Sequence, residues 1–237
     1  MTQIESAAPP AHPDDEGGEA PLTGEALLQD TTARLEEDIV FGRLHPRERL
    51  IEEDLSRQLG VKRHVVRQAI VELERLGLVE RARNRGAVVK LYTVKEVQDI
   101  NAVRELLEGE AARLIPLPLG AEALERLRRW QRVHAEAVET GDRPAVFRAN
   151  IAFHEELFSH CGNAALIEAI RAYAQKSHAY RSIFVNDDTY LRWAAGAHGE
   201  MLEAIVSEDR ESLVRLCLAH LAPAMEHYIG TIRARQP

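Results

Sequence analysis

Several features that would place the chain in a specialised class are scarce or absent. Only two of its 237 residues are cysteines, which excludes a disulfide framework and is typical of a reducing compartment. No apolar run approaches the roughly 20 residues that cross a bilayer, so we expect no membrane segment. The N-terminus has acidic residues and prolines instead of the basic start and apolar stretch of a signal peptide. We therefore expect a cytoplasmic protein.

The residues that dominate instead are helix formers, and charge is distributed unevenly. Aromatic residues make up only 5% of the chain, which argues against an all-β fold, whereas Ala, Leu, Glu and Arg favour helices. The net charge of −8 by itself argues against nucleic acid. However, residues 1–42 contain ten acidic residues and one basic residue, whereas residues 43–90 contain twelve basic and seven acidic residues. Because counterion release is local, this basic segment is compatible with DNA binding.

The chain divides into three segments. Residues 1–24 contain four prolines and five acidic residues but no basic residue, and we expect this tail to be disordered because it has little apolar surface to bury. Residues 25–92 and 93–235 each show periodic apolar patterns that suit a compact domain. We therefore predict a mainly α protein with two folded domains.

The first folded segment has the pattern of a winged helix. An amphipathic helix from Glu25 to about Gly42 precedes two short helices, at 52–59 and about 62–76, which are separated by Gly60. Two apolar strands then flank a turn at 83–86, which predicts a β-hairpin. A helix-turn-helix followed by a basic hairpin is typical of DNA-binding proteins.

The candidate DNA-binding residues lie at the start of the second short helix and at the hairpin tip. Arginine side chains at such positions can contact guanine or phosphate, and a glycine allows the hairpin backbone to approach DNA closely. The alternative interpretation is a solvated basic helix face beside an ordinary hairpin. The candidates are Lys62, Arg63, His64, Arg67, Arg83, Arg85 and Gly86.

The second folded segment is expected to be an all-helical bundle. Apolar periodicity and turn residues predict about six helices and no strand. The predicted helices cover residues 94–114, 121–140, 143–161, 163–185, 188–206 and 209–234.

Within this bundle, one asparagine and three histidines form a candidate metal site. Asn150 and His154 are four residues apart and so share a helix face. His198 and His220 are equally distant from the turn predicted at 207–209, so antiparallel helices would bring them to the same height. Three imidazoles and one oxygen suit Zn²⁺, Ni²⁺ or Mn²⁺. Alternatively, each histidine is an ordinary polar side chain with a satisfied hydrogen bond.

Several short runs of residues form an ordered set along the chain. In the helical half they are Val103-Arg104-Glu105-Leu106-Leu107-Glu108 and Phe153-His154. In the winged helix they are Gly42-Arg43-Leu44, Pro46, Leu50-Ile51-Glu52-Glu53-Asp54-Leu55-Ser56-Arg57-Gln58-Leu59-Gly60-Val61, Arg63, Val66-Arg67-Gln68-Ala69, Leu73, Leu76-Gly77-Leu78-Val79 and Arg85-Gly86-Ala87-Val88-Val89. Together these runs resemble the GntR regulators and, in the helical half, the FCD-type ligand domain of the FadR subgroup. The chain departs from the family pattern at Arg47, Lys62, His64 and Val65, which leaves the operator sequence open.

This resemblance implies a function and partners. Members of the family bind palindromic double-stranded DNA as homodimers, and the residues that match Arg63, Arg67 and Gly86 contact DNA. Many FadR-like ligand domains hold a divalent metal through residues that match Asn150, His154, His198 and His220. The metal holds a small carboxylate effector, and Arg104 matches a nearby arginine. The alternative for Arg104 is an ion pair with Glu108, four residues along the same helix.

We therefore predict a DNA-binding transcription regulator, not an enzyme, whose operator affinity responds to a small organic acid held on a divalent metal. One alternative is a metal-sensing regulator without an organic effector. Another is a metalloenzyme with a winged-helix docking module, although no general base is evident from the sequence.

Overall fold

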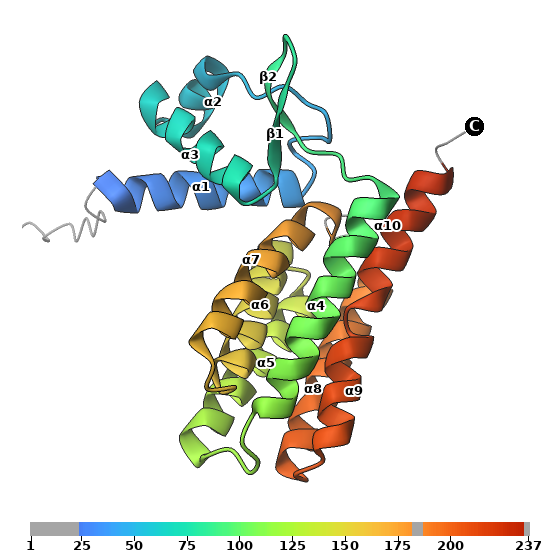
Figure 1. The fold of residues 1–237 in the computed structure, drawn as a ribbon. Helices are drawn as coiled ribbons and strands as arrows, with labels where there is room; N and C mark the ends of the chain where they lie inside the picture. Colours follow the sequence, from blue (N-terminus) through green and yellow to red (C-terminus); the bar gives the residue numbers. More distant parts are fainter. Residues whose placement is uncertain (1–23, 182–186, 235–237) are drawn as a thin grey trace, which may run out of the picture.

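The computed structural model describes residues 24–181 and 187–234, and the tail expected to be disordered lies almost wholly outside them. A small domain with a β-hairpin lies across one end of an elongated helical bundle (Figure 1). The predicted mainly α fold with a hairpin wing is confirmed. Among the described helices, none combines the length and apolar character that a bilayer crossing requires.

The small domain contains three helices and one hairpin. Its elements are α1 (Gly24–Val40), α2 (Glu52–Leu59), α3 (Arg63–Arg75), β1 (Val79–Ala82) and β2 (Gly86–Val89). The strands pair antiparallel, with Val79 opposite Val89 and Ala82 opposite Gly86. Their apolar side chains join those of the helices in one core that includes Leu35, Leu73 and Leu78, each fully buried.

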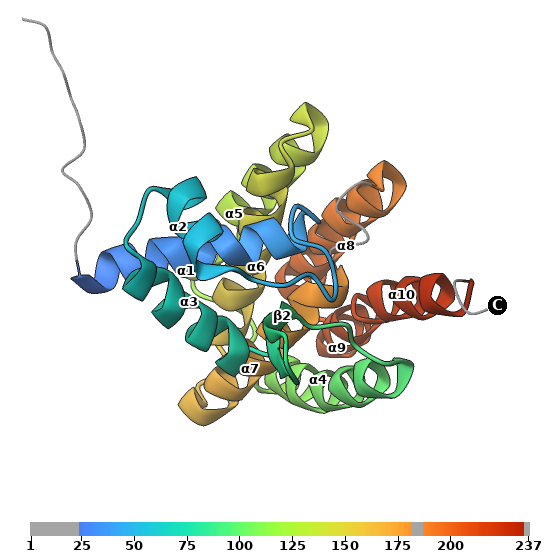
Figure 2. The same ribbon diagram turned by 90° about the horizontal axis from the view of Figure 1, so that it is seen from above.

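The bundle contains seven helices within the described residues, one more than predicted. They are α4 (Val94–Leu114), α5 (Ala121–Thr140), α6 (Arg143–Ser159), α7 (Ala164–Arg181), α8 (Asp188–Val206), α9 (Arg210–Ala219) and α10 (Ala222–Ala234). Helix α4 begins at a capping box in which Thr93 and Glu96 bond reciprocally. Figure 2 shows α1 lying over the end of the bundle, close to α6 and α7.

The single helix predicted for 209–234 is wrong, because the chain breaks at His220 and Leu221. Pro223 explains the break. Proline lacks an N–H group, and its ring would clash with the carbonyl of residue 219 in a continuous helix. It is tolerated in the first turn of α10, where that N–H group needs no helical partner. His220 therefore lies at a helix end.

Helix α1 and the linker residue Tyr92 connect the two domains. Glu37 of α1 pairs with Arg148 of α6 at 2.6 Å, and the rings of Phe41 and Phe147 meet edge to face. The Tyr92 hydroxyl donates to the carbonyl of Gly77 at 2.7 Å. The Tyr228 hydroxyl of α10 donates to the main-chain carbonyl of Tyr92 at 2.8 Å. The winged helix is thus held at two places.

The contact between Tyr92 and Gly77 predicts an unequal cost for two glycine substitutions. Both Gly60 and Gly77 have positive φ, but an added Cβ meets nothing at Gly60 and lies 2.8 Å from the Tyr92 hydroxyl at Gly77. Gly60→Ala should lower the free energy of unfolding by about 1–2 kcal/mol through backbone strain alone. Gly77→Ala should cost about 1–2 kcal/mol more, because the Tyr92 hydrogen bond is also disturbed. Urea unfolding followed by circular dichroism measures both, and equal losses would contradict the role of Tyr92.

Candidate functional site

Helix α3 divides into a buried face and an exposed basic face. Val65, Val66, Ala69, Ile70 and Leu73 are buried against the domain core. The predicted DNA-binding side chains of this helix, by contrast, are all exposed: Lys62, Arg63, His64 and Arg67. The N-terminal end of α3 is therefore free to enter a groove.

One of these arginines already has a carboxylate partner. Arg67 donates from Nε and Nη2 to both carboxylate oxygens of Glu52, at 2.7–3.1 Å. The hydrogen bond from Arg67 holds the pKa of Glu52 below its usual range. Glu52 lies in the first turn of α2, so this ion pair links the two helices of the helix-turn-helix. Arg67 must leave Glu52, or share it, to contact a base.

The tip of the wing is exposed and basic. The Arg85 amide donates to the Ala82 carbonyl at 3.0 Å and closes the turn. Asn84 and Gly86 adopt positive φ there, a conformation that asparagine and glycine accept readily. Arg83, Arg85 and Gly86 are all exposed, and the structure thus presents them on the same hairpin tip.

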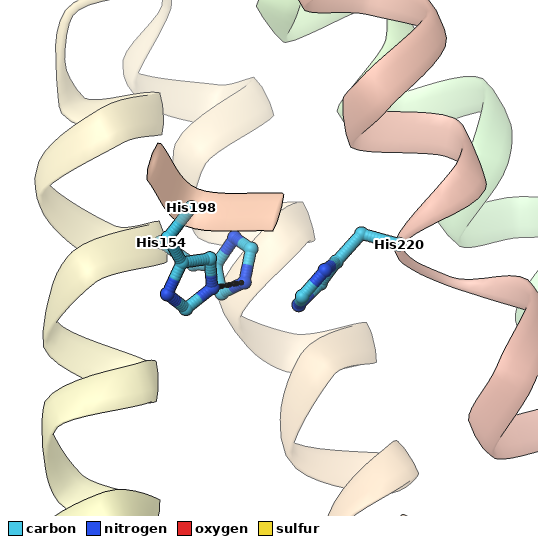
Figure 3. Close-up of side chains that lie close together, drawn as sticks. All are labelled: His154, His198 and His220. Carbon is cyan, nitrogen blue, oxygen red and sulfur yellow. Dashed lines mark hydrogen bonds between the residues drawn. The ribbon is translucent and has the colours of Figure 1, made fainter. Parts of the chain in front are cut away.

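The three candidate histidines of the bundle come together from three helical elements. His154 belongs to α6, His198 to α8, and His220 caps the C-terminus of α9. Their ring centroids are 4.9–5.0 Å apart in every pair. Figure 3 shows the rings of His154 and His198 side by side, with the ring of His220 facing them from the other side.

The spacing of the ring nitrogens suits a metal ion. One nitrogen from each ring lies within 4.8 Å of the other two, and Nε2 of His198 is 3.2 Å from Nε2 of His154. Two imidazole nitrogens that bind one tetrahedral zinc at about 2.0–2.1 Å lie about 3.4 Å apart. The donor set and its spacing therefore fit a divalent transition metal.

Aromatic rings hold the three histidines, which we call the histidine cluster. Phe153 stacks on His198 with centroids 4.1 Å apart, and Trp193 stacks on His220 at 5.3 Å. The buried ring of His134 lies 4.7 Å from that of His198. The sequence analysis gave no role to Trp193 or His134. Trp193 lies five residues before His198 and His134 lies on α5, so their contacts depend on helix packing that no motif reports.

Beside the cluster lies a cavity of about 210 Å³. His154 and Asn150 line it from α6, and Arg104 and Glu108 line it from α4. Asn150 therefore faces the same space as His154, one helical turn away. Gln175 and His178 of α7 line the cavity as well. The four sequence-predicted ligands and Arg104 thus gather around one region of the bundle.

The ion pair with Glu108, expected as the alternative role of Arg104, is present in the structure. Arg104 and Glu108 are both buried, and Nη2 of Arg104 lies 2.8 Å from Oε1 of Glu108. Burial alone would lower the pKa of Arg104, but the charge of Glu108 and the hydroxyl of Tyr180 outweigh it, so the pKa lies above its usual range. Arg104 therefore remains charged, and Glu108 neutralises it.

The other charged groups of the cavity are paired too. Nε of Arg171 lies 3.1 Å from Oε1 of Glu155, and His178 contacts Glu36. Each carboxylate of the described lining thus has one basic partner. An anion that enters the cavity would therefore compete with these carboxylates for the basic groups.

The two cysteines have no chemical role in this region. Cys161 and Cys217 are buried free thiols. Burial raises the pKa of Cys217 far above its usual range, so this thiol does not ionise near neutral pH.

Comparison with known proteins agrees with the two-domain architecture. Residues 27–89 match the model of the bacterial regulatory proteins of the gntR family, and residues 99–223 match the model of the FCD domain. The chain is 28% identical over 220 residues to a protein of Paenarthrobacter nicotinovorans named "Probable D-xylose utilization operon transcriptional repressor", covering 90% of this chain and 96% of that protein. It is 26% identical to the transcriptional regulator McbR of Escherichia coli, covering 85% and 93% of the two chains.

Solved structures share the fold. The structure of Escherichia coli McbR has a TM-score of 0.72 at 22% identity and covers 89% of this chain and 99% of its own. A GntR regulator from Rhodococcus also has a TM-score of 0.72 at 22% identity, covering 86% and 97%.

The relatives are named as transcription regulators, so the metalloenzyme alternative is not supported and the chain is a regulator, not an enzyme. It belongs to the gntR family of bacterial regulatory proteins and carries an FCD domain behind its winged helix.

Proposed function

We propose that this regulator belongs to the FadR subgroup and binds a palindromic operator as a homodimer, with an affinity that responds to a small organic acid in the FCD domain. The observation that carries this proposal is the histidine cluster beside the cavity. Metal ligands next to a ligand-sized space are what a metal-held effector requires.

The DNA contacts are proposed from exposure and charge. Lys62, Arg63, His64 and Arg67 lie at the N-terminal end of α3, the part of a recognition helix that enters the major groove. Arg83, Arg85 and Gly86 at the wing tip would contact the adjacent backbone or minor groove. Two copies related by a twofold axis would place their α3 helices about one DNA turn apart, which corresponds to a palindromic site.

The metal is proposed on the histidine cluster, with Asn150 as a fourth ligand. Zn²⁺, Ni²⁺ and Mn²⁺ all accept imidazole nitrogen with an oxygen donor. When bound, such an ion supplies two positive charges and an open position for a carboxylate oxygen. A neutral asparagine in place of a carboxylate ligand reduces the negative charge of the site and hence its affinity for a cation.

The charge balance of the cavity supports a carboxylic acid as the effector. Arg104 is neutralised by Glu108 and Arg171 is paired with Glu155, so neither arginine offers an unshared charge. An anion beside them would compete with these carboxylates, and a cation added at His154 would offset their repulsion. Arg104 then orients the acid from the cavity wall. A regulator that senses metal alone would need no such cavity, and this favours an organic effector.

Substitution of Arg63 should weaken specific DNA binding. We expect Arg63→Ala to reduce affinity for DNA selected by the parent protein by about 1–3 kcal/mol, roughly 5- to 150-fold, because a bidentate contact to guanine is lost. The matched control is Arg75→Ala, at the far end of the same helix, where Arg75 is exposed and paired with Glu72. Fluorescence anisotropy at several salt concentrations measures both. Equal affinities for the parent and Arg63→Ala would overturn the proposed recognition face.

Removal of the cluster should abolish metal binding. The protein purified without a histidine tag or chelator should contain about one metal ion per chain by elemental analysis, and the His198→Ala, His220→Ala double variant should contain none. His160→Ala is the control, since His160 pairs with Glu156 outside the cluster and should leave the metal content unchanged.

Trp193 gives a second readout of the same site. Because it stacks on His220, addition of Ni²⁺ to metal-free protein should quench its fluorescence in a Trp130→Phe background. Absence of both metal and quenching in the parent would refute the metal proposal and leave the DNA-binding proposal intact.

A further inference from the structure

One wall of the FCD cavity is built by the DNA-binding domain. Glu36 lies on α1, yet it lines the cavity together with His154 and Arg104. Its Oε1 lies 2.6 Å from Nδ1 of His178 on α7. A ligand in the FCD domain therefore meets a side chain that belongs to the winged helix.

The surroundings of His178 make it a carboxylate-binding position. The His178 ring is only 4% exposed, and the edge-to-face contact with Phe147 fixes its orientation, with centroids 5.0 Å apart. A buried imidazole that lost its carboxylate would be costly unless another acceptor replaced it. Any group that displaces Glu36 must therefore offer a similar oxygen.

The distance from His178 to the histidine cluster sets the length of such a ligand. His178 contacts Phe147, which precedes His154 on α6 by seven residues. That is about 10 Å along the helix axis at 1.5 Å per residue. An acid held near His154 therefore needs a second acidic group several bonds away to meet His178, and a monocarboxylate has no such group.

We propose that the cavity takes a small dicarboxylate, one end of which lies at the histidine cluster while the other replaces Glu36 on His178 and releases α1 from the bundle. This inference rests on the proposed acid effector and adds the chemical class of that effector and its route to the DNA-binding domain. His178 is the second group that binds the ligand, and Glu36 is the side chain that the ligand displaces.

Release of Glu36 alters how the winged helix is held without detaching it. The Glu37–Arg148 pair and the contact of Phe41 with Phe147 lie beside Glu36 and remain. Loss of the buried contact leaves α1 with the edge-to-face ring contact and with an ion pair whose arginine is exposed, which is weak in water. The winged helix then no longer has one fixed orientation, and a dimer that needs two α3 helices at a fixed spacing loses DNA affinity. By thermodynamic linkage, bound DNA lowers the affinity of the protein for the dicarboxylate by the same factor.

The test compares two neighbouring glutamates of α1. Glu36→Gln removes the carboxylate that faces the cavity, and Glu37→Gln is the matched control because Glu37 makes an interdomain ion pair but does not line the cavity. Zinc-supplied protein is titrated with succinate, glutarate, adipate and butyrate. Calorimetry gives ligand affinity, and anisotropy gives the affinity for selected DNA with and without each acid.

The expected result separates ligand binding from its effect on DNA. In the parent and in Glu37→Gln, the best dicarboxylate should lower DNA affinity about tenfold, and butyrate should have little effect. Glu36→Gln should bind that dicarboxylate several-fold more tightly, because a neutral amide competes less for His178. Its DNA affinity should already be low and change less than twofold when ligand is added.

A second variant tests the anchor itself. His178→Gln should lose the preference for dicarboxylates over butyrate while still binding an acid at the cluster. If Glu36→Gln keeps the full parental response of DNA affinity, or His178→Gln keeps the parental preference, the inference is wrong and the effector proposal stands. If none of the acids binds the zinc-supplied parent, the acid-effector proposal fails and this inference fails with it.

Discussion

The architecture depends on the packing of α1 between two domains. One face of this helix supplies Leu35 and Ile39 to the winged-helix core, and the next face supplies Glu36 and Glu37 to the bundle. A helix that is part of one core cannot shift without moving that domain as a body, because packed cores deform little. Contacts on its outer face, together with the hydrogen bond between Tyr228 and Tyr92, therefore set the orientation of α3 and the wing relative to the FCD domain.

Electrostatics inside the bundle follow from the cost of burying charge. Arg104 and Glu108 neutralise one another where water is excluded, and His178 is matched to Glu36. Within the cavity, these pairs leave neither buried basic group without a carboxylate partner. The metal ion proposed at the histidine cluster would add positive charge beside these balanced pairs.

Much of this organisation could be predicted from the sequence, and the rest depends on packing. Gly60, Gly77 and the hairpin turn predicted the winged helix, because such turn residues mark the ends of short helices and strands in the local sequence. The equal distances of His198 and His220 from one turn predicted their approach. Pro223 marks the break between α9 and α10 in the sequence, although apolar periodicity predicted one continuous helix there.

Contacts between distant segments had no such local pattern. The ring of His134 beside His198 and the side chain of Glu36 in the cavity join helices that are far apart in sequence. Sequence periodicity assigns a residue to a buried face, but it does not specify which helix lies opposite. The lining of the cavity therefore emerged only from the three-dimensional structure.

The position of Glu36 limits how far the two halves of such a regulator can be exchanged. A chimera that joins this FCD domain to the winged helix of a relative would replace α1, and with it one side chain of the cavity. The recombined protein would have a changed cavity lining as well as a changed helix α3. Recombination between regulators of this architecture is therefore constrained to partners that already carry a carboxylate at this position.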